Sequence, residues 1–182
     1  MPLKTSPHSP TAREAALLMK ATFAISMLGI FFGIFWFFLD VNISVRIAAA
    51  TLVGIVGILS CIRHSVYYES DQVRMGWHQE HPEFQLEVGY ANFAIGIWGL
   101  IISVFNGGAF ACGLILAVYA TYLLCTFFLH LSGTRGSTGS PINKDQGRAI
   151  RSTFTTGFYV IVLSGFAFIS FAQAGIIPFF HP

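Results

Sequence analysis

The sequence predicts an all-α membrane protein, a polytopic bundle of five transmembrane helices. Only 10% of the 182 residues are charged and 54% are apolar, whereas a soluble domain carries about 25% charged residues. The mean hydropathy of +0.68 agrees with this excess of hydrocarbon. Five stretches approach the roughly 20 consecutive apolar residues with which a helix crosses a bilayer. These observations exclude most soluble folds and make lipid the expected solvent.

The predicted spans lie in the parts of the chain that have almost no charged residues. A helix is the expected conformation, because unpaired backbone groups are costly in lipid and the sequence lacks the alternating strands of a barrel. Arg46 near the start of the second span and Glu87 at the start of the third are the charged residues inside these stretches. The spans cover residues 21–39, 43–62, 86–105, 109–131 and 153–175.

Two local signals predict where helices begin and end. Thr11 and Glu14 have the spacing of a capping box, which predicts a helix that begins beside Thr11 and runs into the first span. The third and fourth spans are separated by Asn106-Gly107-Gly108, and Asn and Gly tolerate the positive φ of a tight reversal. We therefore expect two antiparallel spans there instead of one long helix.

The spans are expected to form one transmembrane domain, residues 17–178. A tail of residues 1–16 precedes it, and residues 179–182 form a C-terminal tail. Residues 63–85 and 132–150 are expected to be cytoplasmic loops. The second loop is rich in Gly and Ser, but it lacks the Gly-Lys-Ser/Thr ending of a phosphate-binding loop.

The distribution of basic residues predicts the orientation, because basic residues favour the cytoplasmic side. With the N-terminus in the cytoplasm, only Arg46 of the ten basic residues lies outside. We therefore expect a multi-pass protein of the plasma (inner) membrane with its N-terminus in the cytoplasm and its C-terminus outside. The inside residues are Lys4, Arg13, Lys20, Arg63, Arg74, Arg135, Lys144, Arg148 and Arg151.

Composition and motifs also limit the partners and the chemistry. The net charge of +2 gives no concentrated basic face, so no nucleic-acid partner is expected. The lipid bilayer is the expected partner. No catalytic residue is predicted, because no nucleophile and base form a recognisable local motif. An enzyme is therefore the less favoured interpretation, but the sequence does not exclude it.

Small residues form a stripe on each predicted span, which favours close packing of helices in lipid. Gly54 and Gly57 lie on this stripe in the second span, and Gly96 lies on it in the third. The first span has a Gly29-x-x-x-Gly33 pair, which would also suit dimerisation. We therefore expect a compact bundle that is able to form a homo-oligomer.

A candidate polar or ion site is expected on the cytoplasmic side. His64 follows the second span, Glu87 begins the third and His130 ends the fourth, while Asn92 lies deeper on the small-residue stripe of the third. A structural interpretation competes with this one. Histidines at helix ends bind the final carbonyls, and the helix dipole stabilises a carboxylate in a first turn.

Three residues of this region carry groups that bind metals. Cys61 and His64 share a helix face at the spacing i, i+3, and His130 could supply a third ligand for zinc, a redox metal or haem. A closed zinc site needs four ligands, and Cys-x-x-His is common by chance. The sequence therefore requires no cofactor and leaves the identity of any cofactor open.

A resemblance to a known family rests on the segment Phe84-Gln85-Leu86-Glu87-Val88-Gly89-Tyr90-Ala91-Asn92-Phe93-Ala94-Ile95-Gly96, with His64 before it and His130 after it. The segment resembles a family of short multi-span membrane proteins of bacteria and archaea, a domain of unknown function. The resemblance covers the middle half of the chain. It implies no activity, substrate or cofactor, but it indicates that His64 to Asn92 is the distinctive region.

Three functions fit the sequence. We favour a structural or accessory component that self-associates or docks on a larger membrane complex, because each span has a small-residue face and there is no sizeable soluble domain. The first alternative is a transport or proton-relay protein that uses the polar site at the cytoplasmic ends of the second, third and fourth spans. The second alternative is a metal- or haem-binding redox protein.

Overall fold

The computed structural model describes residues 11–75, 82–135 and 144–178. Every regular element in these residues is a helix, which confirms the all-α class. Five of the described helices are long and apolar enough to cross a membrane, which confirms the five predicted spans. Their bounds are Arg13–Phe37, Val41–Val66, Glu83–Val104, Gly108–Leu129 and Thr153–Gln173.

The second span combines ordinary helical turns with wider π-helical turns. Its four segments follow one another without a break, and the last π turn closes with a hydrogen bond of 3.1 Å from the Tyr67 amide to the Ile62 carbonyl. π-helical turns are rare and often occur at functional sites. The elements are α1 (Arg13–Phe37), α2 (Val41–Ala48), η1 (Ala49–Ile55), α3 (Val56–Cys61), η2 (Ile62–Val66), α4 (Tyr68–Met75), α5 (Glu83–Val104), α6 (Gly108–Arg135) and α7 (Lys144–Gln173).

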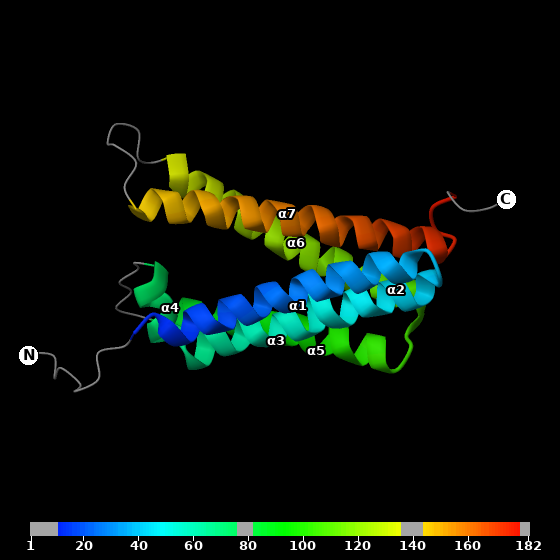
Figure 1. Ribbon diagram of the computed structural model, residues 1–182, viewed down its shortest axis with the longest axis horizontal. Helices are drawn as coiled ribbons and strands as arrows, with labels where there is room; N and C mark the ends of the chain where they lie inside the picture. Colours follow the sequence, from blue (N-terminus) through cyan, green and yellow to red (C-terminus); the bar gives the residue numbers. More distant parts are fainter. Residues whose placement is uncertain (1–10, 76–81, 136–143, 179–182) are drawn as a thin grey trace, which may run out of the picture.

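Figure 1 shows two groups of helices that run along the long axis of the molecule. Helices α6 and α7 pack against each other as a pair, while α1, the second span and α5 form the other group. The pair contacts α2, η1 and α5, so the two groups meet mainly near the end at which α2 begins. Helix α4 lies at the opposite end, against the start of α1. We call this the α4 end.

The buried core lies between the second span, α6 and α7. Val45, Leu52 and Val53 of the second span pack with Leu116 of α6 and Leu163 of α7, and each of these side chains is fully buried. Because lipid is as apolar as these side chains, close van der Waals packing is what favours this association over contact with lipid.

The second span and α5 approach each other to backbone contact. A Cβ atom added at Gly57 would lie 2.7 Å from the Asn92 carbonyl oxygen and 2.8 Å from the Cα atom of Gly96. A Cβ atom added at Gly96 would lie 3.0 Å from the carbonyl oxygen of Gly54. The predicted small-residue stripes are therefore the contact surface of these two helices.

The Gly29-x-x-x-Gly33 pair also makes contacts within the chain. Both glycines are buried. Gly29 faces Thr51, and a Cβ atom added at Gly33 would lie 2.7 Å from the Phe166 ring. Dimerisation through this pair stays a prediction, and it would have to use a face that already contacts the bundle of its own chain.

The structure confirms the predicted chain reversal between the third and fourth spans, but it differs from the predicted capping box at the start of the first helix. Asn106 has a φ of 53° and Gly108 a φ of 83°, so the predicted reversal between α5 and α6 is confirmed. The capping-box prediction at Thr11 is wrong, because Ala12 is the N-cap of α1 and no side chain caps the helix. The Thr11 hydroxyl instead donates to the Glu14 carboxylate over 3.0 Å. A side-chain pair has replaced the expected bond to a backbone amide.

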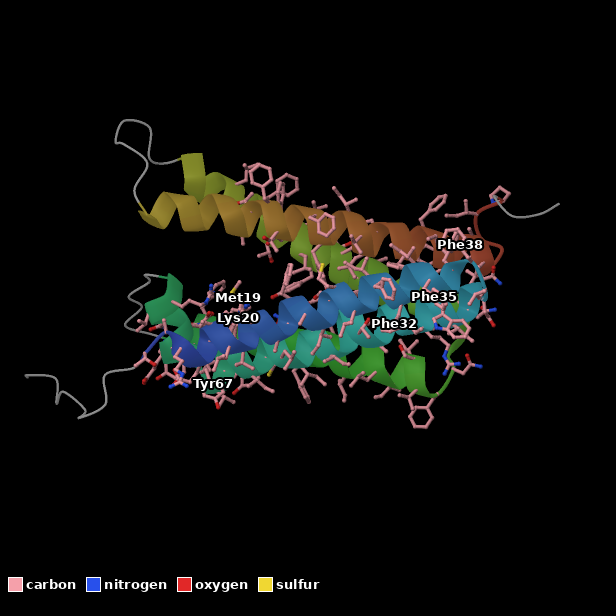
Figure 2. All side chains as sticks on the ribbon, in the orientation of Figure 1. Met19, Lys20, Phe32, Phe35, Phe38 and Tyr67 are labelled. Carbon is pink, nitrogen blue, oxygen red and sulfur yellow. The ribbon has the colours of Figure 1, made fainter. Side chains whose placement is uncertain are left out.

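The outer surface of the bundle is rich in large apolar side chains. Figure 2 shows Phe32 and Phe35 on α1 and Phe38 directly after it, and each of them is exposed. Of the five spans, α1 is the least buried within the bundle. An exposed apolar surface of this kind is suited to contact with lipid or with another membrane helix.

Candidate functional site

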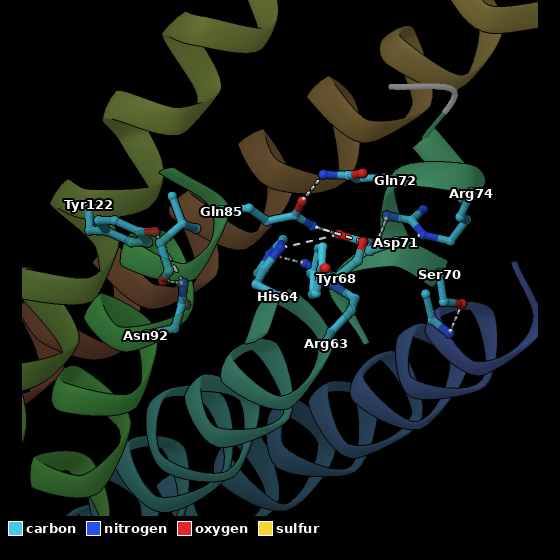
Figure 3. A network of polar contacts seen from close by, with 12 residues as sticks. Arg63, His64, Tyr68, Ser70, Asp71, Gln72, Arg74, Gln85, Asn92 and Tyr122 are labelled. Atoms are coloured by element: carbon cyan, nitrogen blue, oxygen red, sulfur yellow. Dashed lines mark hydrogen bonds and ion pairs between the residues drawn. The ribbon is translucent and has the colours of Figure 1, made fainter. Parts of the chain in front are cut away.

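A buried carboxylate is the centre of the polar contacts at the α4 end (Figure 3). Asp71 of α4 has only 1% of its side chain exposed. Arg74, one turn later on the same helix, donates to Asp71 Oδ1 from Nε over 2.9 Å and from Nη2 over 2.8 Å. The second span provides two further basic groups, Arg63 and His64. We call Asp71, Arg63, His64, Arg74 and Gln85 the Asp71 cluster.

Arg63 and His64 reach Asp71 from the π-helical segment η2. His64 Nδ1 lies 3.1 Å from Asp71 Oδ2, and Arg63 Nε lies 3.8 Å from Asp71 Oδ1. Neither nitrogen has the alignment of a hydrogen bond, so these contacts are electrostatic. The wide turn allows two successive side chains to approach one carboxylate.

The contact between Arg63 and His64 fixes where the imidazole carries its proton. Arg63 Nη2 lies 2.7 Å from His64 Nε2. A guanidinium can only donate, so Nε2 has to accept. The neutral ring therefore carries its proton on Nδ1, which faces the Asp71 carboxylate.

Helix α5 contributes amide groups to the cluster. Gln85 Nε2 donates to Asp71 Oδ2 over 3.4 Å and to the Tyr68 carbonyl over 3.5 Å. The Gln72 amide of α4 donates back to Gln85 Oε1 over 3.2 Å. Gln85 is buried, so these bonds satisfy a polar side chain that would be costly without partners.

Helix α4 is also bonded to the start of α1. The Ser70 hydroxyl accepts from the Ala15 amide over 3.1 Å and donates to the Glu14 carboxylate over 3.3 Å. Through Ser70 and Asp71, the short helix α4 connects α1, the second span and α5. This arrangement fixes the ends of the three helices relative to one another.

The charges around Asp71 decide its protonation state. Burial raises the pKa of Asp71, but the contact with His64 and the charges of Arg63 and Arg74 outweigh it and hold the pKa at about 2. Asp71 is therefore ionised near neutral pH. A buried carboxylate remains charged here because cationic groups surround it.

A second polar group lies deeper in the bundle, around Asn92. The Tyr119 hydroxyl donates to Asn92 Oδ1 over 3.1 Å, and Asn92 Nδ2 donates to the Tyr122 hydroxyl over 3.1 Å and to the Val88 carbonyl over 2.8 Å. The two tyrosine rings are stacked, with an interplanar angle of 8°. We call Asn92, Tyr119 and Tyr122 the Asn92 group.

Of the four residues of the predicted polar site, His64, Glu87 and Asn92 do not form one group in the described structure. His64 belongs to the Asp71 cluster and Asn92 to the Asn92 group. Glu87 is exposed on α5. His130 lies on α6, but its side chain is outside the described residues, so this part of the prediction stays untested.

The predicted metal ligands are also only partly described. Cys61 Sγ lies 3.8 Å from the Ser65 hydroxyl. His64 has no lone pair free for a metal in this arrangement, because Nε2 accepts from Arg63 and Nδ1 carries the proton. Within the described residues no group of three or more His, Cys, Asp and Glu side chains could hold a metal ion. A metal or haem site that includes His130 stays a prediction.

Sequence reasoning missed the residue at the centre of the site. Asp71 falls in a stretch expected to be a loop, and Arg74 was counted only as a basic residue that orients the chain. The spacing i, i+3 of Asp71 and Arg74 is typical of a pair on a short helix and could have indicated α4. Nothing in the sequence pattern indicated that Arg63, His64 and Gln85 would meet the same carboxylate.

No family model, no curated protein and no solved structure matches this chain.

Proposed function

We propose that this protein is a structural or accessory component of a membrane, which self-associates or docks on a larger membrane complex. The observation that carries this proposal is how the polar side chains are used. Within the Asp71 cluster, and likewise within the Asn92 group, the side chains contact one another and connect different helices. They therefore serve to hold the bundle in one arrangement.

The surface recesses of the bundle support the same function. One open groove lies between α6 and α7, and a second between α5 and α6. The second is lined only by apolar side chains, including Ile95, Trp98 and Leu114. Thr121 and Ser164 are the polar side chains that line the first groove. Such mostly apolar grooves are suited to lipid chains or neighbouring helices, whereas a small-molecule site has several converging polar groups.

We propose the outer face of α1 as the surface of association. Phe23, Phe31 and Phe35 are exposed on this helix, and α1 is the least buried of the five spans. Aromatic residues are enriched in protein interfaces. A second copy of the chain packed here would cover the helix that its own bundle covers least.

We further propose that the α4 end faces the cytoplasm in the plasma (inner) membrane, with the C-terminus outside. The excess of basic residues on this side supports the orientation, and Arg13, Arg63 and Arg74 lie at the α4 end. We also propose membership of the family of short multi-span membrane proteins that Phe84 to Gly96 resembles.

Cysteine cross-linking in native membranes tests the association. In a variant without Cys61, Cys112 and Cys125, Phe31→Cys should give a cross-linked species with a second copy or another protein. Ile161→Cys on α7 is the matched control, because Ile161 is also exposed in a membrane-spanning helix, and it should give none. The association surface is wrong if Phe31→Cys gives no more product than Ile161→Cys.

A proton-relay or transport function is the second candidate, and the Asn92 group favours it. Asn92, Tyr119 and Tyr122 are joined by hydrogen bonds inside the bundle, and their amide and hydroxyl groups can both donate and accept, which a proton path requires. Asn92→Leu should abolish proton or solute flux into liposomes. Ser103→Ala, which removes another polar side chain of α5 that bonds only the Gly99 carbonyl of its own helix, should leave it unchanged. An Asn92→Leu variant with the flux of the wild type would exclude the Asn92 group as the path of protons or solutes.

A further inference from the structure

His64 lies between two charged groups of opposite sign. Its Nε2 atom is 2.7 Å from Arg63 Nη2, and its Nδ1 atom is 3.1 Å from Asp71 Oδ2. The contact with Arg63 requires a lone pair on Nε2, because a guanidinium has no acceptor. Only the neutral imidazole therefore fits the arrangement that the structure shows.

We propose that His64 is a proton-operated switch that sets the position of Arg63. A proton added at Nε2 changes this atom from an acceptor into a donor. It also places a second cation against the guanidinium, which like-charge repulsion opposes. The protonated ring keeps Asp71 as its partner, whereas Arg63 loses its acceptor and moves away.

The position of Arg63 makes this movement feasible. Its other contact in the cluster is the long one, with 3.8 Å between Nε and Asp71 Oδ1. The Arg63 side chain is largely buried, with 18% of it exposed and its Nε atom buried, so this movement would carry the guanidinium from the cluster toward the surface of the α4 end. Before protonation, Arg63 is the cation of the second span that contacts Asp71. After protonation, His64 would take this role in place of Arg63.

The surroundings of the ring single out His64 as the group that changes charge. Helix α5 contributes Gln85 and Gly89 beside the cluster, and neither titrates. Asp71 has a pKa of about 2, so it stays ionised between about pH 5 and 8, where histidines titrate. Among the described residues, the charged and titratable groups near His64 and Arg63 are Asp71 and Arg74 on α4, Cys61 on α3, and Tyr119 and Tyr122 on α6 beyond Arg63.

Side-chain nitrogen NMR of the full-length, histidine-labelled protein in lipid nanodiscs tests the first step without any variant. The His64 signals are assigned through the close approach of its Cβ atom to Gly89. At about pH 8 we expect the proton on Nδ1 and a bare Nε2. A ring that carries its proton on Nε2, or one that is already doubly protonated, would overturn the proposal.

A titration of the same signals tests the coupling to Arg63. In Arg63→Gln, the ring no longer repels a neighbouring cation, so His64 should take up its second proton about one pH unit higher than in the wild type. Arg46→Gln is the control, because Arg46 bonds the Ser103 carbonyl at the opposite end of the bundle, and it should cause no shift. An Arg63→Gln midpoint equal to the wild-type midpoint would contradict the switch and would leave the proposed accessory function unaffected.

Discussion

At the scale of single residues, Asp71 is central, because its carboxylate is in contact with three basic side chains. Arg63 and His64 come from the second span, whereas Arg74 comes from α4 itself. A buried ion pair is not necessarily stabilising compared with an apolar replacement, but removing one partner alone is costly. The cluster is therefore a site where single substitutions should have large effects.

Removal of the Asp71 charge should destabilise the bundle. Asp71→Asn leaves Arg63 and Arg74 without their shared carboxylate in a largely buried position, which should lower the free energy of unfolding by about 3 kcal/mol. Unfolding in a mixed-micelle denaturation series measures the change. Glu69→Gln is the matched control, because Glu69 is an exposed acidic residue of the same helix. Equal stability of the two variants would show that Asp71 does not hold α4.

The pH dependence of stability should carry a signature of Asp71. Its pKa is about 2 in the folded protein, compared with an ordinary value of 3.8. Because the folded value is lowered, the ion pairs contribute fully above about pH 4, and the contribution is lost as the pH falls toward 2. The stability of the wild type should therefore approach that of Asp71→Asn as the pH falls below about 4, and the two should converge below about pH 2. A difference that is independent of pH would contradict this role of the charge.

At the scale of elements, the spans were predictable but their details were not. The five membrane helices follow from apolar composition, which lipid imposes over some 20 residues at a time. The π-helical turns of η1 and η2 have no such signature, and the polar helix α4 is too short to be recognised by periodicity. The contacts between η2 and α4 depend on the folded chain, which alone brings Arg63, His64 and Asp71 together.

The glycine contact between the second span and α5 should not tolerate a methyl group. In Gly57→Ala the new Cβ atom would meet the backbone of α5 at 2.7 Å, and a backbone cannot rotate away as a side chain can. We expect a loss of about 2 kcal/mol in unfolding free energy, measured in the same denaturation series.

Gly165 of α7 provides the matched control for this prediction. A Cβ atom added there would meet nothing within 4 Å, and alanine favours a helix more than glycine by about 1 kcal/mol. Gly165→Ala should therefore leave the protein as stable as the wild type or slightly more stable. If Gly57→Ala behaves in the same way, the two helices are not in backbone contact.

At the scale of the whole molecule, the bundle has polar side chains that bond one another between its helices and many large apolar side chains on its outer surface. Asp71 and the Asn92 group join helices, and the exposed phenylalanines of α1 remain for lipid or a partner. The sequence indicated part of this division, because its few charged residues are concentrated outside the apolar stretches. It could not indicate which polar residues would meet.

The mass of the particle that the protein forms in its own membrane tests the central claim most directly. Nanodiscs excised from native membranes with an amphipathic polymer, without detergent, keep neighbouring proteins in place, and native mass spectrometry then measures the protein content of each disc. The account predicts discs that contain this chain together with at least one further copy or another membrane protein. Discs that contain a single copy of the chain and no other protein would contradict it.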